Sequence, residues 1–431
     1  MSAGDDGRAG ATRGARRSPS LDLVIVGAGI LGLATARELL HRHPDLRLAV
    51  IDREHQVGAH QTAHNSGVIH AGIYYAPGSL KARLCVEGAA RMYRYCEEQG
   101  IAAERCGKLI VAADASELPR LDALEERGIA NGVPGLRRVN RPEEIAEIEP
   151  HCAGVAALHS PSTGIVDFAA VARRLAEEIR AAGAEIMLGE GVVDVRAGNH
   201  AVDLDLQNHA ITARNAVFCA GGWSDRLAAK AGIELDLRIV PFRGQYLQLK
   251  PRQRHLVKGL IYPVPDPALP FLGVHLTRHI SGGVLIGPTA LMVGARDAYR
   301  LRRLRAPDLW SSLSWPGTWR MMRRFWRAGL TEMTLAASRP AFVRACARYL
   351  PGLTTEDVEA GPAGVRAQAV LRDGKLVDDF VFAGAGRSLH VLNAPSPAAT
   401  SSLAIASVIA ERAAATFGIE ARGCSATEGV R

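Results

Sequence analysis

A glycine-rich turn between a buried strand and a helix, near the start of the chain, constrains the fold more than any other feature. Residues 21–26 form a short apolar run, and residues 27–32 follow in the G-x-G-x-x-G pattern. Helix-forming residues with apolar side chains at helical spacing then occupy 30–41. A second apolar run, 46–51, ends at Asp52. This order predicts a βαβ unit and a parallel sheet covered by helices.

The glycine pattern is typical of a dinucleotide-binding turn. Gly27 permits the tight turn, Gly29 lets a pyrophosphate approach the backbone, and Gly32 lets the helix pack on the sheet. Free N–H groups at the helix start, from Ile30 onward, favour an anion there. Asp52 stands where a ribose-binding carboxylate is expected, about 20 residues beyond the last glycine. The pattern predicts FAD or NAD without distinguishing them, and the alternative is a glycine turn kept for packing alone.

Two later glycine clusters favour FAD over NAD. One follows the strand predicted at 216–219, and the other, 384–386, lies close to the C-terminus. A long cofactor that crosses a whole domain needs contacts that are this far apart in sequence. We therefore expect an α/β and α+β fold, with a Rossmann-like FAD-binding domain beside a substrate-binding domain built on a mixed sheet.

The pattern of strands and helices divides the chain between these two domains. The FAD-binding domain is expected at 21–100, 151–237 and 360–417, and the substrate domain at 101–150 and 238–359, with a helical segment at 299–350. Residues 1–20 and 418–431 are expected to be flexible tails. The first of these lacks the apolar core of a secretory signal, and Asp5 and Asp6 argue against a transit peptide.

Composition excludes several classes of protein. The chain has 431 residues, enough for two domains, and no apolar run of about 18 residues that would span a membrane. Its 7 cysteines show neither C-x-x-C pairs nor metal-ligand spacing, which indicates free thiols in a reducing compartment and no metal site. The net charge of +8 comes without a nucleic-acid-binding motif. We expect no nucleic-acid partner and a cytoplasmic protein.

One basic segment, 299–327, combines eight arginines with four tryptophans. Arginines interleaved with interfacial aromatic side chains suit an anionic membrane surface and would bring the protein to the inner face of the membrane, near a quinone. The alternative is a helical subdomain whose tryptophans face the core.

A polar loop, 60–84, follows the βαβ unit and reads HQTAHNSGVIHAGIYYAPGSLKARL. This stretch resembles the L-2-hydroxyglutarate oxidases and dehydrogenases, members of the D-amino-acid-oxidase-like (DAO) flavoprotein superfamily. Further similar stretches lie at 163–167, 241–246, 262–267, 271–275, 362–368 and 392–400, so the resemblance covers about residues 20–415. It implies oxidation of L-2-hydroxyglutarate to 2-oxoglutarate, with FAD as hydride acceptor and quinone or oxygen as the final acceptor. Ala63 departs from the glycine that the family pattern leads us to expect, which leaves a related 2-hydroxy acid open.

Oxidation of a secondary alcohol requires a base for the hydroxyl proton, and histidine suits this task. His70 is the first candidate, because by resemblance its loop passes beside the flavin. His275, on a strand of the substrate domain, is the second, and His390 is a weaker third. The alternative for each is a structural histidine.

A dianionic substrate requires cationic or hydroxyl partners for its carboxylates. Arg366 lies in a segment similar to one that carries a substrate-binding arginine in DAO-type relatives. The other candidates are Tyr75, Lys81, Arg243 and Tyr262. A surface salt bridge is the alternative for each charged side chain.

The remaining expected cofactor contacts follow from the fingerprint and the resemblance. In the polar loop, Thr62, Asn65 and Ser66 can bind phosphate or the flavin edge. The loop at 393–400 runs into a helix whose N-terminus would favour the anionic reduced flavin. Further contacts are expected at Arg53, Gly67, Val193, Ala220, Gly221, Trp223, Gly386, Pro395, Ser396 and Ala398.

Two other functions compete with this one. The same fold could oxidise a small amine, as in glycine or sarcosine oxidases. The chain could also be a non-enzymatic scaffold that binds a flavin or NAD, or a nucleic acid. The acidic substrate implied by the resemblance and the stretch 262–267 argue against the first. A purified protein without flavin absorbance would favour the second over both enzymatic functions.

Overall fold

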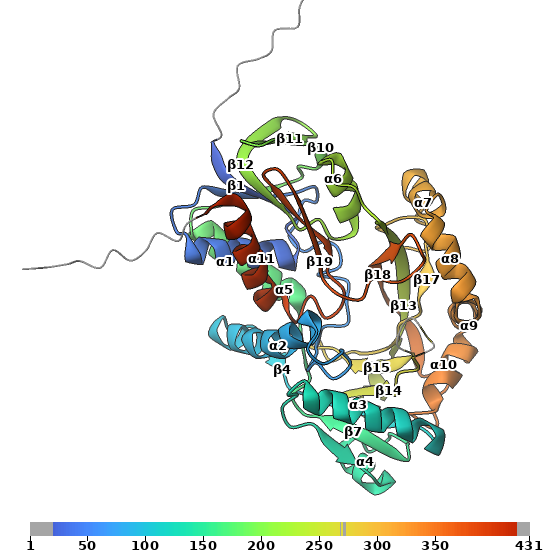
Figure 1. The fold of residues 1–431 in the computed structure, drawn as a ribbon. Helices are drawn as coiled ribbons and strands as arrows, with labels where there is room; N and C mark the ends of the chain where they lie inside the picture. Colours follow the sequence, from blue (N-terminus) through green and yellow to red (C-terminus); the bar gives the residue numbers. More distant parts are fainter. Residues whose placement is uncertain (1–19, 268, 270–272, 420–431) are drawn as a thin grey trace, which may run out of the picture.

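A mixed sheet with a parallel centre forms around the N-terminal βαβ unit, and the glycine pattern predicts its parallel part (Figure 1). The structure is a computed structural model that describes residues 20–267, 269 and 273–419. In this sheet β1 pairs in parallel with β2 and β12, and β2 pairs in parallel with β9. The strands are β1 (Leu21–Val26), β2 (Leu48–Asp52), β9 (Glu185–Leu188), β10 (Val192–Ala197), β11 (Val202–Leu206), β12 (Ala210–Phe218), β19 (Val381–Ala385) and β20 (Ser388–Asn393). The C-terminal strand β20 returns to pair in parallel with β12.

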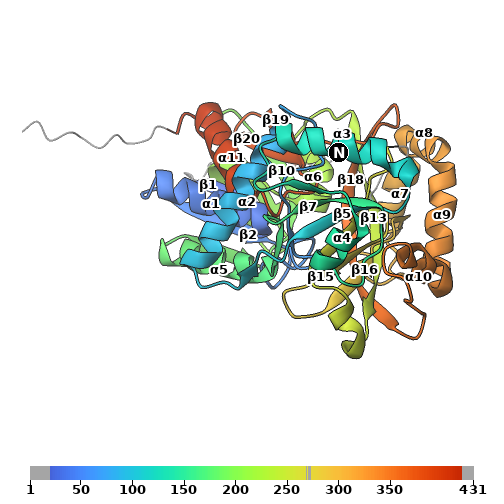
Figure 2. The ribbon, with the colours of Figure 1, turned by 90° about the horizontal axis from the view of Figure 1, so that it is seen from below.

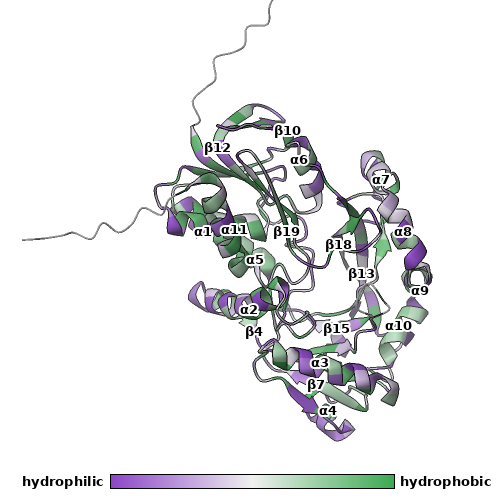
Figure 3. Ribbon diagram, in the orientation of Figure 1, coloured by the Kyte–Doolittle hydropathy of each residue, from purple (hydrophilic) through white to green (hydrophobic). Residues whose placement is uncertain are grey.

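Both faces of this sheet are covered, which explains why β1 is continuously apolar and buried from Leu23 to Val26. Leu23 and Ile25 pack with the helix layer, and Val24 and Val26 pack with the β10–β12 side. The helix layer consists of α1 (Ile30–Arg42), α2 (Leu80–Glu98), α5 (Phe168–Ala181) and α11 (Ser402–Phe417), with α6 (Ser224–Lys230) on the other face. Figure 2 shows α1, α2, α5 and α11 together on one side of the molecule, and Figure 3 shows their mixed hydrophobic and hydrophilic faces.

A second sheet follows the order β17-β13-β16-β15-β14-β5-β7-β6, with β18 paired to β13. Its strands are β5 (Lys108–Ala112), β6 (Arg137–Val139), β7 (Ala156–Ser160), β13 (Leu237–Leu249), β14 (Leu260–Pro263), β15 (His275–Arg278), β16 (Val284–Gly287), β17 (Leu291–Met292) and β18 (Val358–Leu371). A small sheet contains β3 (Val68–Ile69), β8 (Gly164–Val166) and β4 (Ala103–Glu104). Shorter helical elements are α3 (Leu118–Ala130), α4 (Pro142–Ile148), η1 (Ala115–Glu117), η2 (Gly221–Trp223) and η3 (Pro251–Leu256).

The basic segment forms a chain of helices along the outer side of the second sheet (Figure 1). These are α7 (Ala306–Leu313), α8 (Pro316–Arg324), α9 (Trp326–Ala337) and α10 (Arg339–Ala347). The sequence predicts two or three helices here, and the structure divides the segment more finely. Prolines in the first turn of α7, α8 and α10 explain the division, because proline starts a helix readily and cannot continue one.

Several expected boundaries differ from the observed ones. Strands β7 and β18 belong to the second sheet, so the expected limits at 151 and 360 assign both strands to the wrong side. Helix α2 begins at Leu80, inside the stretch 60–84 that is expected to be a polar loop, because Ser79 Oγ accepts the Ala82 N–H at 3.1 Å and caps it. Gly88 lies inside that helix, where an added Cβ would come within 2.5 Å of Ser401 Cα. The expected tails, 1–20 and 418–431, fall almost wholly outside the described residues.

Three features of the described residues bear on function. The helices among them are all too short or too polar to cross a membrane. The same part of the chain contains no cluster of three or more potential metal ligands. Its cysteines are free thiols.

Candidate active site

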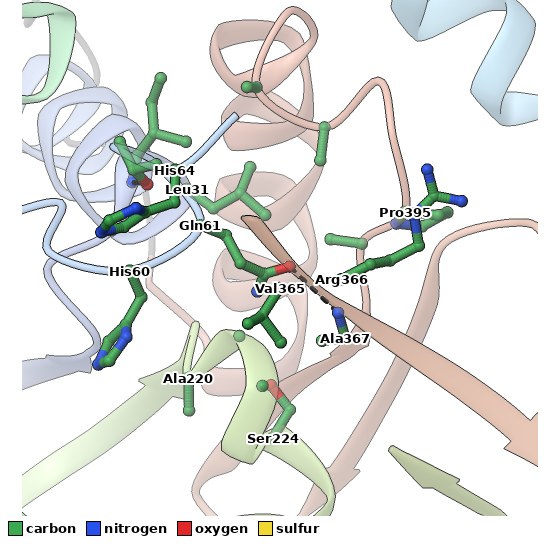
Figure 4. A pocket seen from close by; sticks show the side chains of 18 of the residues that line it. Leu31, His60, Gln61, His64, Ala220, Ser224, Val365, Arg366, Ala367 and Pro395 are labelled. Atoms are coloured by element: carbon green, nitrogen blue, oxygen red, sulfur yellow. Dashed lines mark hydrogen bonds between the residues drawn. The ribbon is translucent and has the colours of Figure 1, made fainter. Parts of the chain in front are cut away.

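A cavity of about 840 Å³ lies between the glycine turn and the second sheet. Its lining includes the β1–α1 turn, the loop 53–66, residues 364–368 of β18, and the loop 394–400 before α11. Figure 4 shows side chains from the first loop, from β18 and from the C-terminal loop around this space. Gln61 Oε1 accepts the Ala367 N–H at 3.4 Å and so connects the first loop to β18 (Figure 4).

The three fingerprint glycines have different roles in the turn. Gly27 has φ +114°, and an added Cβ would lie 2.4 Å from Cys219 O. A Cβ on Gly32 would lie 1.9 Å from Gly27 O, so Gly32 lets the helix pack on the turn. A Cβ on Gly29 would meet only Thr62 Oγ1, at 3.5 Å. The protein therefore fills the space beside Gly27 and Gly32 but leaves the space beside Gly29 open to a ligand.

The side chains around the turn hold its backbone in place. Thr62 Oγ1 accepts the Ile30 N–H at 3.1 Å, at the start of α1. Asp52 Oδ2 accepts the Ala28 N–H at 2.7 Å, and its Oδ1 accepts the Glu54 N–H at 2.9 Å. The Asp52 carboxylate also lines the cavity, where its remaining lone pairs can accept a ribose hydroxyl.

Beyond the glycine turn, the cavity passes between Arg53 and the short helix η2. The Arg53 guanidinium lies 3.5 Å from the centre of the Trp223 ring. Val193, Ala220 and Gly221 line the cavity beside it. This combination of flat and small side chains suits the nucleoside end of a dinucleotide.

The C-terminal loop closes the cavity opposite the turn. Pro395, Ser396 and Ala398 line it. Thr400 Oγ1 accepts the His70 N–H and donates to Val68 O, both at 3.1 Å, which fixes the two loops together. The hydroxyl of Ser401, just before α11, is buried without a hydrogen-bond partner among the described residues.

Residues of the polar loop 60–84 differ in what they contribute to the cavity. Ser66 lines the cavity. Asn65 also lines it, but its side chain hydrogen-bonds Gln61 O, Thr62 O and the Gly67 N–H, so it mainly holds the loop. Ala63 is exposed and lies outside the lining, so its methyl group does not narrow the cavity.

Some expected site residues lie away from the cavity lining. Gly386 occupies the β19–β20 turn, where a Cβ would lie 2.6 Å from Gly198 O. Gly67 has φ +72° and packs on Val166 O. Arg243 donates to Tyr299 O and to Gln245 Oε1. Tyr75 lies behind the lining with its ring 4.8 Å from Lys81 Nζ. The structure thus gives Gly386, Gly67 and Arg243 packing or scaffolding roles.

Both histidines that the sequence singles out reach the cavity. Burial lowers the pKa of His70 to about 3 and that of His275 to about 4, with the nearby Lys108 charge lowering both further. Both rings are therefore neutral at neutral pH and able to accept a proton. His275 Nδ1 lies 2.8 Å from Gly273 O, so Nδ1 carries the proton and Nε2 is the acceptor. His70 Nδ1 is buried without a partner among the described residues.

Cationic and phenolic side chains surround these histidines. Arg366, from β18, is exposed to the cavity that it lines, and desolvation by the surrounding protein lowers its pKa. Lys81 Nζ donates to Asp378 Oδ1 at 2.8 Å. The Tyr262 ring stacks on His275 with 4.0 Å between ring centres. This part of the cavity suits a small anion.

Several residues of the site have no assigned role in the sequence prediction: Gln61, Tyr246, Lys108, Asp378 and Thr400. Tyr246 is buried beside Arg366, and burial raises its pKa to about 12. It ends the family-like stretch 241–246, which could have identified it. Gln61 and Thr400 lie in the family-like stretches 60–84 and 392–400, which could have identified them as well. Lys108 and Asp378 carry no such signal, because strand pairing and loop closure bring them to the site.

Comparison with known proteins decides the family. A family model described as "FAD dependent oxidoreductase" (DAO) matches residues 22–412.

The chain belongs to the FAD-dependent oxidoreductase family.

Among similar members, a mitochondrial L-2-hydroxyglutarate dehydrogenase from Nematostella vectensis is 48% identical over 93% of this chain and 92% of its own. The mitochondrial L-2-hydroxyglutarate dehydrogenase from Homo sapiens is 46% identical over 95% and 91%. An L-2-hydroxyglutarate dehydrogenase from Indibacter alkaliphilus is 43% identical over 92% and 99%.

Solved structures establish the fold. L-alpha-glycerophosphate oxidase from Mycoplasma pneumoniae, solved with FAD bound, matches with a TM-score of 0.75 at 22% identity, over 92% of this chain and 94% of its own. Glycine oxidase from Geobacillus kaustophilus matches with a TM-score of 0.69 at 20% identity, over 93% and 95%. The predicted flavoprotein fold, the FAD cofactor and the enzymatic class are confirmed. The open space beside Gly29 and the unpaired polar atoms of His70 and Ser401 fit this FAD-dependent oxidoreductase's cofactor.

Proposed function

We propose that this FAD-dependent oxidoreductase converts L-2-hydroxyglutarate to 2-oxoglutarate. The observation that supports it best is the cationic end of the cavity, where the charges of Arg366 and Lys108 lie within reach of the neutral His275. Two carboxylates and one hydroxyl match two cations and one base. The resemblance to L-2-hydroxyglutarate dehydrogenases at 43% to 48% identity points to the same substrate. The substrate's C2 hydrogen would leave as a hydride, for which bound FAD supplies the acceptor.

We infer that His275 is the base that receives the hydroxyl proton. Its Gly273 partner fixes the tautomer in which Nε2 accepts, whereas His70 Nδ1 has no hydrogen-bond partner in the part of the chain that the structure describes. Stacking on Tyr262 restrains the His275 ring further. His70, held by Thr400 through its backbone, is assigned to the cofactor side of the cavity.

Arg366 is the proposed partner of the C1 carboxylate. Its planar guanidinium can form two parallel hydrogen bonds with a carboxylate, which fixes the orientation of the C2 carbon. The buried Tyr246 hydroxyl beside it is protonated at neutral pH and can donate a further hydrogen bond.

Anaerobic mixing of the FAD-loaded protein with each enantiomer tests the substrate. The L enantiomer of 2-hydroxyglutarate should bleach the flavin absorbance, and the D enantiomer should not. Glycine, sarcosine and D-amino acids serve as comparison substrates for amine oxidation. Bleaching by any of these without bleaching by L-2-hydroxyglutarate would contradict the proposal.

A second proposal concerns the electron acceptor and the location. We propose that α8 and α9 hold this protein, otherwise cytoplasmic, at the inner face of an anionic membrane, where a quinone is the acceptor. Trp319, Trp326, Leu330 and Met333 are 53% to 60% exposed, while arginines 320, 323, 324 and 327 are exposed beside them. Aromatic side chains next to arginines suit a lipid headgroup layer. Only Trp315 of the segment's tryptophans is buried.

Flotation with anionic liposomes at low salt tests this surface. Wild type should float, and the double variant Trp319→Ser/Trp326→Ser should remain at the bottom of the gradient. Ile129→Ser, which removes a side chain that is 65% exposed on α3, is the matched control and should float. A wild-type protein that does not float, or a double variant that floats equally well, rules the surface out.

A further inference from the structure

Lys108 is buried at the site without an anionic partner. It begins β5, and only 2% of it is exposed. Its ammonium lies 4.6 Å from the centre of the Tyr74 ring and 4.9 Å from that of Tyr262. Ring faces attract a cation more weakly than a carboxylate does, so a fully buried ammonium held only by rings is costly.

The other buried Lys and Arg side chains of the described chain all have oxygen acceptors. Lys81 holds Asp378, Arg243 holds Tyr299 O and Gln245, and Arg296 holds Asp225. Among the described residues, no hydrogen bond or ion pair joins the Lys108 ammonium to an oxygen. An anion that enters from outside would satisfy it.

The strand register brings Lys108 directly behind Tyr262, which lines the active-site cavity, although Lys108 itself is not part of the lining. On β5 it pairs with Leu260 of β14, two residues before Tyr262 on the same face of the sheet. Tyr262, His70 and His275 line the cavity, and the Lys108 charge lowers the pKa of both histidines. Lys108 therefore lies within electrostatic reach of the atoms that would hold the substrate.

His275 also lies within reach of the Arg366 charge, from a different strand. A five-carbon diacid with one carboxylate on Arg366 could place its C2 hydroxyl at His275. Its second carboxylate would then extend toward another cation. The long, flexible lysine side chain can leave the two tyrosine rings to meet it.

We propose that Lys108 binds the substrate's second carboxylate and so determines the preference of this enzyme for a dicarboxylate. Lys81 is the less suitable cation, because its ammonium already holds a carboxylate. This inference rests on the proposed function. It identifies the residue that recognises the substrate's second carboxylate.

The lowered pKa of Lys108 predicts a second observable, proton uptake on ligand binding, which does not depend on turnover. Burial lowers this pKa to about 7, and the groups that face Lys108 are Tyr74, Cys85, Tyr262, His70 and His275. At about pH 8 most of the free protein would hold Lys108 uncharged, and a bound carboxylate would draw a proton onto it. Binding of a dicarboxylate should therefore take up a proton.

The variant Lys108→Met tests the proposal, with Lys258→Met as control. Methionine matches the buried apolar stem, and Lys258 is an exposed lysine just before β14. The substrates are L-2-hydroxyglutarate and L-2-hydroxyvalerate, which has the same chain length with a methyl group in place of the second carboxylate. Wild type and Lys258→Met should prefer the diacid in kcat/KM by about 10²-fold or more, because a buried ion pair is strong. Lys108→Met should lose that preference while the monoacid changes by less than about threefold.

Calorimetry gives a readout that does not depend on turnover. Glutarate binding at about pH 8, in buffers of different ionisation enthalpy, should show proton uptake in wild type and Lys258→Met and none in Lys108→Met. Thermal melting and flavin absorbance verify that each variant is folded and loaded. An undiminished diacid preference, or proton uptake that persists in Lys108→Met, overturns the Lys108 proposal. A wild-type flavin that L-2-hydroxyglutarate does not bleach instead overturns the proposed function, and glutarate calorimetry still decides on Lys108.

Discussion

At the scale of single residues, the site combines neutral bases with Lys108, a cation that no hydrogen bond or ion pair joins to an anion among the described residues. Burial drives both effects, since it removes the proton from histidine and lowers the pKa of lysine and arginine. A base that is already neutral needs no prior deprotonation to accept a proton. A cation without a protein anion retains its capacity for a substrate carboxylate.

Replacing His275 should affect the chemical step more than replacing His70. Asparagine in place of His275 can still donate to Gly273 O but cannot accept the substrate proton. We expect His275→Asn to retain FAD and to slow anaerobic flavin reduction by L-2-hydroxyglutarate by about 10²-fold or more. His70→Asn should slow it less. The opposite order, measured by stopped-flow absorbance, would move the base to His70.

The pH profile of kcat/KM should separate the histidines from Lys108. With the pKa of His275 lowered to about 4, the base remains deprotonated across the neutral range. Protonation of this base should therefore reduce kcat/KM only in acid. With the pKa of Lys108 lowered to about 7, its charge is present below that pH and is lost above it. Turnover of L-2-hydroxyglutarate should then decline above pH about 7, by at most tenfold per pH unit, while that of L-2-hydroxyvalerate should not. Parallel declines for both substrates would contradict this assignment.

At the scale of elements, two glycines of the β1–α1 turn have different roles: Gly27 is needed for packing, and Gly29 leaves space for the cofactor. Gly27→Ala forces a Cβ to 2.4 Å from Cys219 O at a positive φ, whereas Gly29→Ala meets only Thr62 Oγ1 at 3.5 Å. Gly27→Ala should lower the melting temperature of the FAD-free protein, because the turn itself is strained. Gly29→Ala should leave that temperature unchanged and weaken FAD binding, because its methyl group occupies cofactor space. Comparison of FAD-free melting curves with flavin titrations decides, and equal effects on both would contradict the division.

The sequence predicts those elements whose signal is local. The βαβ unit combines apolar runs and helical periodicity with a glycine turn, and it is observed close to its expected bounds. Strand β18 has no such signal: it pairs with β13 across more than a hundred residues, and its glycines obscure the alternation. Gly364, for example, lets β18 pass His64 O, since a Cβ there would come within 2.6 Å.

Among the site residues too, a local sequence signal distinguishes those that can be predicted from those that cannot. Gly29, Asp52 and Arg366 are predicted from motifs and resemblance, and all three line the cavity. Lys108 begins an otherwise apolar strand and looks like a solvated flank. Its burial depends on Tyr74 and Tyr262, which approach from other segments, and no local pattern reports that.

At the scale of the whole molecule, burial of neutral histidines makes stability depend on pH. His390 is the clearest case: it is fully buried on β20, stacks on Phe218 with 4.1 Å between ring centres, and lies outside the cavity lining. Burial lowers its pKa to about 3, in the same direction as for His70 and His275. In the unfolded chain each histidine binds a proton below about pH 6.5.

Because the unfolded state then binds more protons, the free energy of unfolding should fall as the pH decreases from about 6.5 toward the folded pKa. His390 should contribute up to about 1.4 kcal/mol per pH unit to this loss. The variant His390→Phe keeps the stacked ring and removes the titrating group. Urea unfolding with a fixed excess of FAD should show a shallower loss between pH about 6.5 and 5 in this variant than in wild type. The exposed His200, replaced by Phe, is the control and should follow wild type. A pH dependence unchanged in His390→Phe would show that other groups determine the acid sensitivity of the fold.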